Sequence, residues 1–534
     1  MFLIAILIGI YSYIIFFLGV LGLISKPIVG VISALYFFTA FFLMGKTNVI
    51  RFSKKRFLNF RLKNNKLVCL FLTFLVGQII VNFIGVLGPE ISFDALWYHL
   101  TLPKIYILFH SIFHIPGNLL FYSDMPKLTE MLYVPSLMFG SEITAKLIHF
   151  TFGILCLPVI YKVSRKFIPK AFAILAVLVF YSNLVVGWES ISAYIDLSRT
   201  FFEIMSFWGF LNWIEKRRKK WLVISAVLLG FAIASKVIAL ESLIIFFALF
   251  VYLHITERGK LTDLIKSLFT FVTFAVLVPI PWFIFSFINT GNPLYPFFDK
   301  RIDVGTNFQI PNFLNSGRDL INLFIYSNDP ISPIYLIVFP LLLFGFFKAK
   351  KEIKIICIYS FLALIAWYIT PRVGGGRFIL PYLSVFSVIV SYSIYTLKES
   401  RVKILLIAIV VLISLSSLGY RAIANKRYLP VILGKETKAE YLTKHLNFSF
   451  GDFYDTDNYF KNNIKPGDKV LLLGFHNLFY VDFPFIDSSW VKKGDKYNYI
   501  AVQNSLLPEK FNNWQQIYYN PITKVTLYSL GGKQ

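Results

Sequence analysis

The chain has few charged residues: 15% of its 534 residues are Asp, Glu, Lys or Arg, whereas 57% are hydrophobic. This shortage excludes an ordinary water-soluble protein. The apolar residues recur in runs of about 20, long enough to cross a bilayer whose hydrocarbon core is about 30 Å thick. Cysteine is also scarce, and Cys69, Cys156 and Cys357 all lie inside apolar runs. We therefore expect neither a disulfide framework nor a cysteine metal site.

Acidic residues are outnumbered by basic ones, 28 to 53, which gives a formal net charge of +25. Such an excess can indicate nucleic-acid binding. Here, however, the basic residues gather in short stretches between apolar runs, such as Lys216–Lys220 and Lys398–Lys403. These stretches fall in every second loop, as expected when those loops are cytoplasmic. The charge is therefore assigned to membrane topology, with membrane lipids and no nucleic acid as partners.

The apolar runs predict about thirteen transmembrane helices, with a cytoplasmic N-terminus and an extracytoplasmic C-terminus. The first run lacks a basic n-region and a cleavage site, so we interpret it as a retained helix rather than a signal peptide. The predicted spans are 3–24, 28–45, 67–88, 143–162, 170–186, 197–214, 221–235, 238–254, 267–288, 331–347, 353–370, 377–397 and 403–420.

Two parts of the chain lie outside these spans on the predicted outer face. The first large outer loop, 89–142, contains two short apolar segments that predict interfacial helices, Leu100–Ile115 and Leu128–Phe139. After about residue 420 the composition becomes polar. The predicted fold is therefore an all-α polytopic membrane domain, 1–420, followed by a small extracytoplasmic α/β domain, 421–534. In the second domain we expect helices at Glu436–Leu446 and Asp452–Ile464 and strands at Lys469–Gly474, Tyr499–Gln503 and Val525–Leu530.

Ionisable residues near the outer ends of membrane helices are the first candidates for chemistry. Asp94 follows the span 67–88 and could act as a base at the membrane surface. Alternatively, Ser92 or Asp94 could cap a helix that begins at Ala95, and spacing alone favours this cap. His99 would lie on nearly the same helical face as Asp94, with Tyr98 on its flank. It could bind a phosphate or a metal, or make a structural hydrogen bond.

Two further carboxylates belong to the same predicted face. Glu130 lies in MPKLTEML within the first outer loop, and Asp196 lies in SAYIDLSRTFF at the outer end of a span. Asp196 could also simply cap that helix. A common site with Asp94 is geometrically permitted. Because His99 belongs to no HxxxH or HxxE pattern, we assign no metal cofactor, while a divalent ion between the carboxylates stays an open alternative.

Three basic residues could hold an anion on this face. Lys236 lies in a predicted outer turn, and Arg372 and Arg377 flank three glycines in TPRVGGGRFILP. Glycine lets the backbone approach an anion closely, and arginine forms charge-assisted hydrogen bonds with phosphate. The alternative is that both arginines only extend to the membrane surface. Basic residues outside run against the usual bias of membrane proteins, which favours a function.

Taken together, these segments resemble the GT-C membrane glycosyltransferases, particularly bacterial relatives of protein O-mannosyltransferases and lipid A aminoarabinose transferases. The resemblance covers about residues 67–400. It rests on the order of SFDALWYHLTLP, MPKLTEML, SAYIDL, GFAIASKVIAL, GNPLYPFF and RFILPYL along the chain. The chain departs from the mannosyltransferase pattern because Asp94 is followed by Ala95 rather than by a second acid. The two spans before residue 67 also look additional.

The resemblance implies a multi-pass enzyme of the plasma or inner membrane that transfers a monosaccharide from a polyprenyl-phosphate carrier, with inversion. The acceptor would be a lipid, a glycan or a protein. A flippase or transporter of lipid-linked sugars, or an oligosaccharide polymerase or ligase, are the alternatives.

The resemblance also assigns roles to the candidate residues. Asp94 becomes the catalytic base and Asp196 the second catalytic acid, while Lys236 and Arg377 hold the donor phosphate. Further substrate-binding candidates are His99, Tyr98, Glu130 and Arg372. The aromatic residues of the outer loops, Trp97, Tyr98, Trp188 and Tyr194, could stack against a sugar or belong to an interfacial belt.

Overall fold

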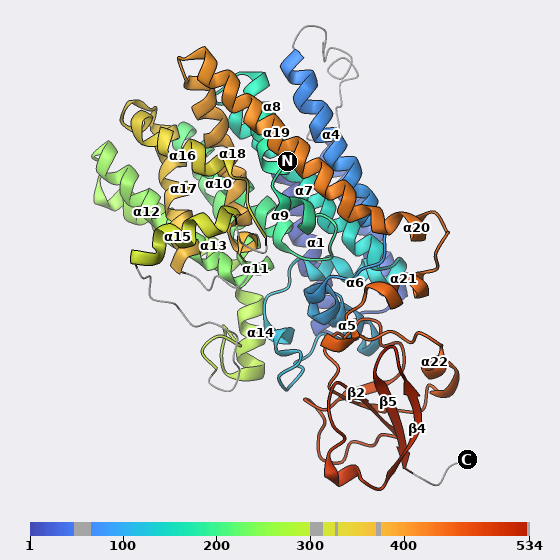
Figure 1. Ribbon diagram of the computed structural model, residues 1–534. Helices are drawn as coiled ribbons and strands as arrows, with labels where there is room; N and C mark the ends of the chain where they lie inside the picture. Colours follow the sequence, from blue (N-terminus) through green and yellow to red (C-terminus); the bar gives the residue numbers. More distant parts are fainter. Residues whose placement is uncertain (47–65, 300–312, 326–328, 370–374, 531–534) are drawn as a thin grey trace.

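The long helices form one bundle, and a small sheet domain lies at one end of it (Figure 1). This arrangement comes from a computed structural model, which describes residues 1–46, 66–299, 313–325, 329–369 and 375–530. The long helices are α1 (Phe2–Val20), α2 (Lys26–Lys46), α4 (Lys66–Val86), α7 (Glu142–Ser164), α8 (Lys170–Tyr181), α10 (Asp196–Lys216), α11 (Lys219–Ser235), α12 (Leu240–Glu257), α13 (Leu261–Leu277), α14 (Ile280–Thr290), α15 (Phe313–Ile325), α16 (Ile334–Gly345), α17 (Lys351–Ile369), α18 (Gly376–Thr396) and α19 (Ser400–Asn425).

Short elements connect these helices or belong to the C-terminal region. Within the bundle they are η1 (Ala95–His99), α5 (Thr101–Phe109), η2 (Phe121–Asp124), α6 (Glu130–Phe139), α9 (Leu184–Glu189), η3 (Val237–Ala239) and η4 (Phe346–Lys348). Towards the C-terminus follow η5 (Lys426–Tyr428), α20 (Leu429–Ile432), α21 (Lys438–His445), η6 (Phe448–Phe450), α22 (Tyr459–Asn463), β1 (Val470–Leu473), β2 (Phe485–Asp487), β3 (Tyr499–Gln503), η7 (Glu509–Phe511), β4 (Trp514–Asn520) and β5 (Val525–Leu530).

Each predicted span coincides with a helix, except for two that are broken: 170–186 is divided between α8 and α9, and 267–288 between α13 and α14. Within the described ranges, eight helices are long and apolar enough to cross a membrane, and the bent pair α13 and α14 would make nine. The chain is therefore a polytopic α-helical membrane protein, as predicted, while the count of thirteen spans stays a prediction. The span predicted at 267–288 bends by 56° between α13 and α14. Pro279 and Pro281 explain the break, because proline has no N–H for the helical ladder.

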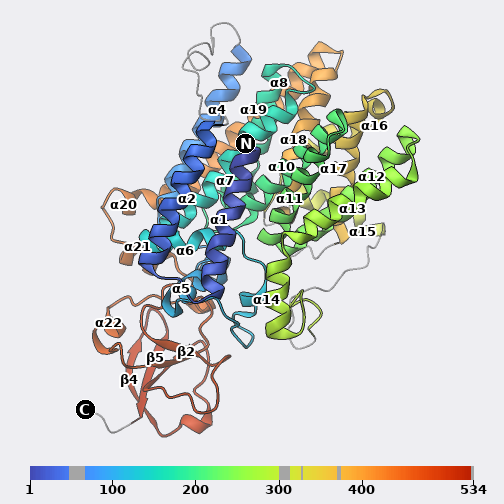
Figure 2. The ribbon, with the colours of Figure 1, turned by 180° about the vertical axis from the view of Figure 1, so that it is seen from behind.

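Two central helices, α10 and α18, are buried along most of their length and pack against each other. Helix α10 also packs closely on α11, since a Cβ at Gly209 would lie 3.1 Å from the Cα of Ser225. The outer helices are different. In α2, on the side shown in Figure 2, only Val29 and Ala40 are buried, and its phenylalanines face outward into the space that lipid would fill. The buried polar residues of α10 and α18 therefore lie in the centre of the bundle.

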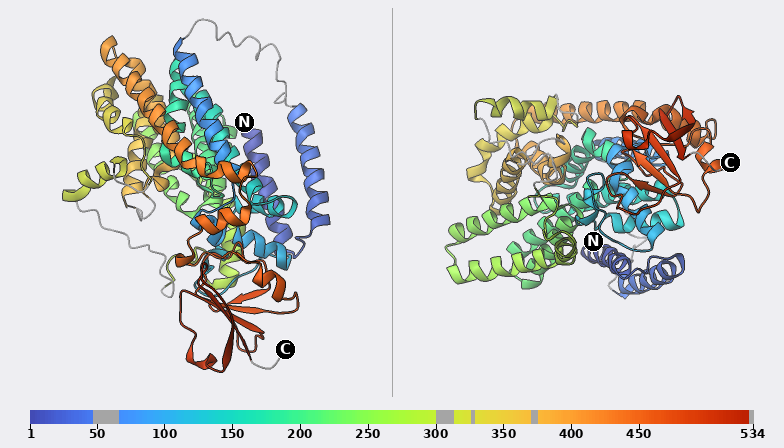
Figure 3. Two further views of the ribbon diagram at one scale, coloured as in Figure 1. Left: turned by 45° about the vertical axis from the view of Figure 1, so that its right-hand side comes forward. Right: turned by 90° about the horizontal axis from the view of Figure 1, so that it is seen from below.

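The first outer loop lies between the bundle and the C-terminal domain (Figures 1 and 3). Both predicted apolar segments are helices here, as α5 and α6. The first is shorter than expected, because His110 adopts a left-handed conformation (φ 58°) and ends α5 at Phe109. Before them, residues Ala95–His99 form one turn of π-helix, a geometry that often marks functional sites.

The C-terminal region contains a five-stranded mixed sheet in the order β2-β1-β3-β5-β4. Strand β1 pairs in parallel with β2 and β3, whereas β5 pairs antiparallel with β3 and β4. The small α/β domain is therefore present as predicted. The helix expected over Asp452–Ile464 is wrong for most of its length: only α22 is helical, starting after Asn458 in a left-handed conformation. The Asp455 carboxylate accepts hydrogen bonds from the N–H groups of Phe460 and Lys461.

Hydrogen bonds and an ion pair connect the sheet domain to the first outer loop. The ammonium group of Lys104, on α5, donates to the carbonyl oxygens of Phe479 (2.7 Å) and Val481 (2.9 Å) and to the carboxylate of Asp482 (2.5 Å). The hydroxyl of Tyr480 donates to the carbonyl of Glu90 at 2.8 Å. The domain therefore rests directly on the segment that contains Asp94.

Candidate active site

Asp94 belongs to a cluster of charged side chains from four separate parts of the chain. Its Oδ2 accepts a hydrogen bond from Nη1 of Arg377 at 2.6 Å. Nε of the same guanidinium donates to Oδ2 of Asp196 at 3.0 Å, and Nζ of Lys236 donates to Oδ1 of Asp196 at 2.6 Å. We call Asp94, Asp196, Lys236 and Arg377 the charged cluster. It joins the first outer loop to the starts of α10, η3 and α18.

These contacts argue against the simpler interpretations of three predicted residues, namely that Asp94 and Asp196 are helix caps and that Arg377 extends to the membrane surface. The carboxylate of Asp94 makes no capping hydrogen bond, and the hydroxyl of Ser92 is bonded to Ser192 instead. Asp196 begins α10, but its two oxygens are held by Lys236 and Arg377 rather than by the helix end. The side chain of Arg377 is only 12% exposed, so it does not extend to the surface. Tertiary ion pairs have replaced the local interactions that spacing favoured.

Glu189, which the sequence did not single out, lies against the same arginine. Its side chain is fully buried, with Oε1 3.2 Å from Nε of Arg377, although that N–H is directed at Asp196. Within the described residues, neither oxygen of Glu189 has a hydrogen bond. Three carboxylates thus face two cations, and an ionised Glu189 would be an uncompensated buried charge. We therefore expect Glu189 to be protonated in the resting site.

Glu189→Gln, which removes only the ability to ionise, is expected to keep the stability of the protein near that of the wild type. Asp196→Asn is the matched comparison, because it removes a carboxylate that two cations hold, and should lower the free energy of unfolding by about 3–5 kcal/mol. Thermal unfolding in detergent measures the difference. If both variants are equally damaged, Glu189 is ionised and the charge assignment is wrong.

Aromatic rings surround the charged cluster. The guanidinium of Arg377 lies 4.3 Å from the ring centroid of Tyr194, and Nζ of Lys236 lies 5.0 Å from that of Phe378. The hydroxyl of Tyr194 accepts a hydrogen bond from the N–H of Asp94 at 3.1 Å, and the hydroxyl of Tyr98 donates to Oδ2 of Asp94 at 3.3 Å. These rings restrict the access of water to the charged cluster and thereby strengthen the interactions between its charges.

The surroundings of Asp94 set its protonation. Burial disfavours its charged form, but Arg377, His99 and Lys236 outweigh that effect and hold the pKa of Asp94 below its ordinary value. The Asp94 side chain is still 19% exposed, so the carboxylate can be reached from outside the protein. In the resting site Asp94 is therefore ionised, accessible and only weakly basic.

His99 and Glu130 form a separate buried pair. Nδ1 of His99 lies 2.8 Å from Oε1 of Glu130, and the two side chains are 1% and 3% exposed. The imidazole contacts the rings of Tyr98 and Tyr194, with centroids 4.2 and 5.5 Å away. The pair is therefore separated from the charged cluster by the rings of Tyr98 and Tyr194. In that position it can hold these two rings in place. Arg372 lies outside the described residues.

Two backbone features hold the loops of the site. The carboxylate of Glu90 accepts hydrogen bonds from its own loop, at Ser92 (2.8 Å), and from Ala193 in the loop before α10 (2.6 Å). At the start of α18, a Cβ on Gly376 would lie 2.0 Å from the carbonyl oxygen of Asp329, so only glycine fits there. Gly376, directly before Arg377, therefore serves close packing of the backbone.

The carboxylates of the charged cluster face cations of the protein. Within the part of the chain that the structure describes, no group of three or more His, Cys, Asp or Glu side chains could hold a metal ion. Asp94 and Asp196 face Arg377 and Lys236 instead. His110 and His114 are spaced as HxxxH, but Nδ1 of the first meets the carbonyl of Ile24 and Nδ1 of the second meets Asp124.

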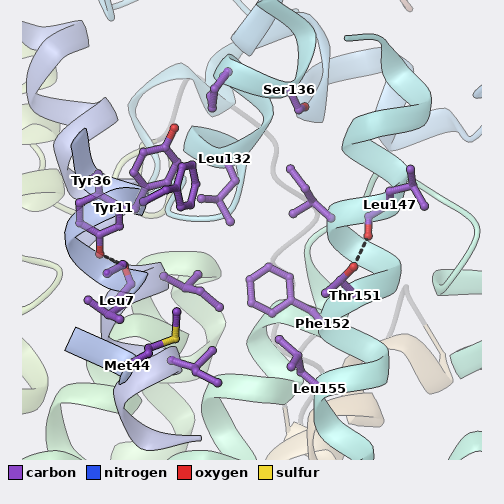
Figure 4. Close-up of a pocket in the computed structure, with 16 residues that line it drawn as sticks. Leu7, Tyr11, Tyr36, Met44, Leu132, Ser136, Leu147, Thr151, Phe152 and Leu155 are labelled. Carbon is purple, nitrogen blue, oxygen red and sulfur yellow. Dashed lines mark hydrogen bonds between the residues drawn. The ribbon is translucent and has the colours of Figure 1, made fainter. Parts of the chain in front are cut away.

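A large apolar cavity lies elsewhere, between α1, α2, α6 and α7 (Figure 4). Its volume is about 550 Å³, and its lining includes Tyr11, Tyr36, Leu132 and Phe152 but no Asp, Glu, Lys, Arg or His. The two tyrosine hydroxyls in it are already bonded, to Ser33 and to the carbonyl of Leu7. The cavity therefore suits an apolar chain.

Part of this chain is similar to a known family, and its fold is similar to solved structures. Residues 134–285, from within α6 to within α14, match the family of dolichyl-phosphate-mannose-protein mannosyltransferases. The fold resembles that of ArnT from Cupriavidus metallidurans bound to undecaprenyl phosphate, with a TM-score of 0.59 at 12% identity, over 87% of this chain and 99% of that one. The GT-C-like fold predicted from the sequence is thereby confirmed. The match over residues 134–285 agrees with the predicted enzyme class.

Other solved GT-C structures are also similar. ArnT from the same organism in the apo state gives a TM-score of 0.56 at 12% identity, with the same coverage. The archaeal oligosaccharyltransferase AglB from Archaeoglobus fulgidus, in complex with an inhibitory peptide and a dolichol-phosphate, gives 0.46 at 12% identity, over 80% of this chain and 69% of that one. No curated protein matches this chain in sequence. The family match includes Glu189, Asp196 and Lys236 of the site described above.

Proposed function

We propose that this chain is a GT-C glycosyltransferase that transfers a monosaccharide from a polyprenyl-phosphate carrier to an acceptor hydroxyl at the outer face of the cell membrane, with inversion at the anomeric carbon. One observation carries the proposal: Arg377 links the accessible carboxylate of Asp94 to Asp196 and Lys236. A base and two cations thus meet within one buried cluster. Such a combination suits a reaction in which a hydroxyl loses a proton and a phosphate gains charge.

The donor phosphate would bind Arg377 and Lys236. Nη2 of Arg377 takes no part in the contacts with Asp94, Asp196 and Glu189, and Lys236 spends one of its three donors on Asp196. A phosphodiester can form bidentate bonds with a guanidinium and so compete for Nη1 with Asp94. When the sugar leaves, the phosphate becomes more negative, and the same two cations stabilise that charge. They supply the charge stabilisation that a divalent ion would otherwise bring.

Binding of the phosphate would also activate Asp94. While Arg377 is bound to it, the carboxylate has a low pKa and accepts protons poorly. Once the phosphate shares Arg377, the guanidinium lowers the pKa of Asp94 less. Burial then raises that pKa, and Asp94 becomes a stronger base. Asp94 then takes the proton of the acceptor hydroxyl as that oxygen attacks the anomeric carbon. The bond from this carbon to the phosphate oxygen breaks, and polyprenyl phosphate leaves with the electron pair.

The orientation follows from charge. The short basic loops are assigned to the cytoplasm, which puts the charged cluster and the sheet domain outside. The polyprenyl tail would remain among the helices and the lipid. ArnT, whose fold this chain shares, was crystallised with undecaprenyl phosphate, which supports a carrier of this class.

The acidic limb of the pH profile of kcat/KM, which reports the free enzyme before the donor binds, is expected to move to higher pH in Arg377→Gln. In the wild type, pairing with Arg377 lowers the pKa of Asp94. The carboxylate therefore stays ionised, and transfer continues, at a pH below the ordinary pKa of an aspartate. Without the guanidinium, burial dominates and protonation of Asp94 begins at higher pH. Lys438→Met, at a half-exposed basic residue bonded to Glu142, is the control and should leave the limb in place. An unmoved limb in Arg377→Gln would mean that Asp94 is not the titrating base.

Reconstitution tests the proposed function. The full chain is placed in proteoliposomes with a panel of labelled polyprenyl-phosphate monosaccharides and possible acceptors, and both transfer and transbilayer movement are measured. We expect transfer of single sugars with release of polyprenyl phosphate. Movement of lipid-linked sugar without transfer would identify a flippase instead, and transfer of preassembled oligosaccharides alone would identify a ligase or polymerase.

A further inference from the structure

A row of aromatic rings extends from the charged cluster onto the sheet domain. Phe93, next to Asp94, contacts Trp97 with ring centroids 5.7 Å apart. The imidazole of His476 stacks on Phe93 at 4.9 Å and 28°, and lies 4.5 Å from Trp97. The ring of Phe450 lies 5.1 Å from that of Phe93. We call Phe93, Trp97, Phe450 and His476 the aromatic platform; two residues come from the first outer loop and two from the C-terminal region.

The platform is continuous with the catalytic side chains. Trp97 contacts the rings of Tyr98 and Tyr122, with centroids 5.2 and 5.1 Å away. Tyr98 stacks on Tyr122 at 4.0 Å and donates its hydroxyl proton to Asp94. A molecule lying on the platform would therefore reach Asp94 along an unbroken series of rings.

Packing does not account for the outer end of the platform. The side chain of Phe450 is 59% exposed, whereas Phe448 and Phe453 beside it are 8% and 2% exposed and lie in hydrophobic clusters. Phe93, Trp97 and His476 are half-buried. A group of large apolar rings left partly open beside a reactive carboxylate is typical of a binding surface.

The rings are also held in place. Nε1 of Trp97 donates to the carbonyl of Leu119 at 2.8 Å. Nδ1 of His476 lies 3.0 Å from Oδ1 of Asn477, and the Asn477 amide donates to Asp452 at 2.6 Å. A surface whose side chains are fixed before binding loses little entropy when a ligand arrives.

We propose that the aromatic platform binds the acceptor of the transfer reaction, and that this acceptor is a carbohydrate. The inference rests on the proposed function. Fixed aromatic rings offer a flat apolar surface to the C–H face of a pyranose, while its hydroxyl groups stay free to meet polar partners such as Asp94. The sheet domain then completes the acceptor site, because it contributes Phe450 and His476 from the far end of the chain.

A peptide acceptor suits the surface less well. Extended peptides are commonly held by backbone hydrogen bonds at a strand edge. The platform consists of Trp97 in η1, Phe93 two residues before η1, Phe450 in η6 and His476 in the segment after β1. None of the four belongs to a strand. The platform therefore favours a carbohydrate acceptor over a peptide acceptor.

The test uses the full chain in lipid nanodiscs and two measurements. The first is saturation-transfer NMR of soluble probes, methyl β-pyranosides and disaccharides, which reports binding without catalysis. The second is the KM for a carbohydrate acceptor and for the donor. Phe450→Ala is the main variant and Phe450→Trp the rescue. Leu506→Ala, at a 91% exposed residue of the same domain, is the control.

We expect Phe450→Ala to weaken probe binding and raise the acceptor KM about 10-fold, as the loss of one aromatic contact predicts, with the donor KM unchanged. Phe450→Trp should restore both values, and Leu506→Ala should match the wild type. Absence of probe binding to the wild type, equal binding by Phe450→Ala, or use of peptides alone as acceptors would overturn the inference. Probe binding that depends on Phe450, without any sugar transfer, would instead overturn the proposed function and leave the carbohydrate site standing.

Discussion

Asp94→Asn is expected to lower the rate of sugar transfer by about 10³-fold, in the middle of the range for loss of a general base. The amide has the same shape as the carboxylate, and its oxygen can still accept the hydrogen bond from Arg377. It cannot take the proton of an acceptor hydroxyl. Because the side chain is 19% exposed, the change should leave the fold intact. Single-turnover transfer from a saturating donor measures the effect on the chemical step.

Asp482→Asn is the matched control for this variant. Asp482 is also a carboxylate on the same side of the protein and is also paired with a cation, Lys104, but its side chain is 78% exposed. Exposed ion pairs of this kind contribute about 0–1 kcal/mol. We therefore expect Asp482→Asn to transfer sugar at the wild-type rate. If Asp94→Asn does the same, another group is the base.

Arg377→Gln is expected to affect both transfer and stability. The guanidinium neutralises Asp94 and Asp196 together, so its loss leaves two carboxylates with Lys236 as the one remaining cation of the charged cluster. Breaking a buried ion pair from one side costs about 3–5 kcal/mol. The same variant loses the main ligand of the donor phosphate, so we expect transfer to fall by about 10²–10³-fold, as in the removal of a charge-stabilising donor. Thermal unfolding and steady-state kinetics in detergent check the two effects.

Arg377→Lys separates charge from shape. Lysine keeps the positive charge but cannot donate from two nitrogens in the fixed geometry that now reaches Asp94 and Asp196. It should recover most of the stability lost in Arg377→Gln while the donor KM stays raised. Full recovery of transfer in Arg377→Lys would contradict the assignment of a bidentate contact with the phosphate.

The fold was largely predictable because lipid imposes a simple pattern on the sequence. Apolar runs mark the helices, and Pro279 marks the break in the span 267–288. The sheet was predictable only where its strands are apolar. Strand β2 has three residues, and β4 is an edge strand with mostly exposed positions, so neither gives a clear signal.

The charged cluster was predictable in part. The predicted topology puts Asp94, Asp196, Lys236 and Arg377 on one side of the membrane. Spacing alone favours a helix cap for Asp94 and leaves the role of Asp196 open. That preference fails because Arg377, 283 residues from Asp94, offers a buried ion pair that is stronger than a cap. Glu189 was missed because Arg377, the cation that it approaches at 3.2 Å, is remote in the sequence. The lone acid in VVGWESIS, within an apolar outer segment, was the available signal.

The central claim is that donor phosphate takes Arg377 from Asp94 and thereby places the sugar beside it. The most direct test is a cryo-EM structure of Asp94→Asn in a nanodisc with a bound polyprenyl-phosphate monosaccharide. The account predicts phosphate oxygens within hydrogen-bonding distance of Arg377 and Lys236, and the anomeric carbon facing position 94. A phosphate bound away from these cations, with Arg377 still holding position 94 and Asp196 together, would contradict it.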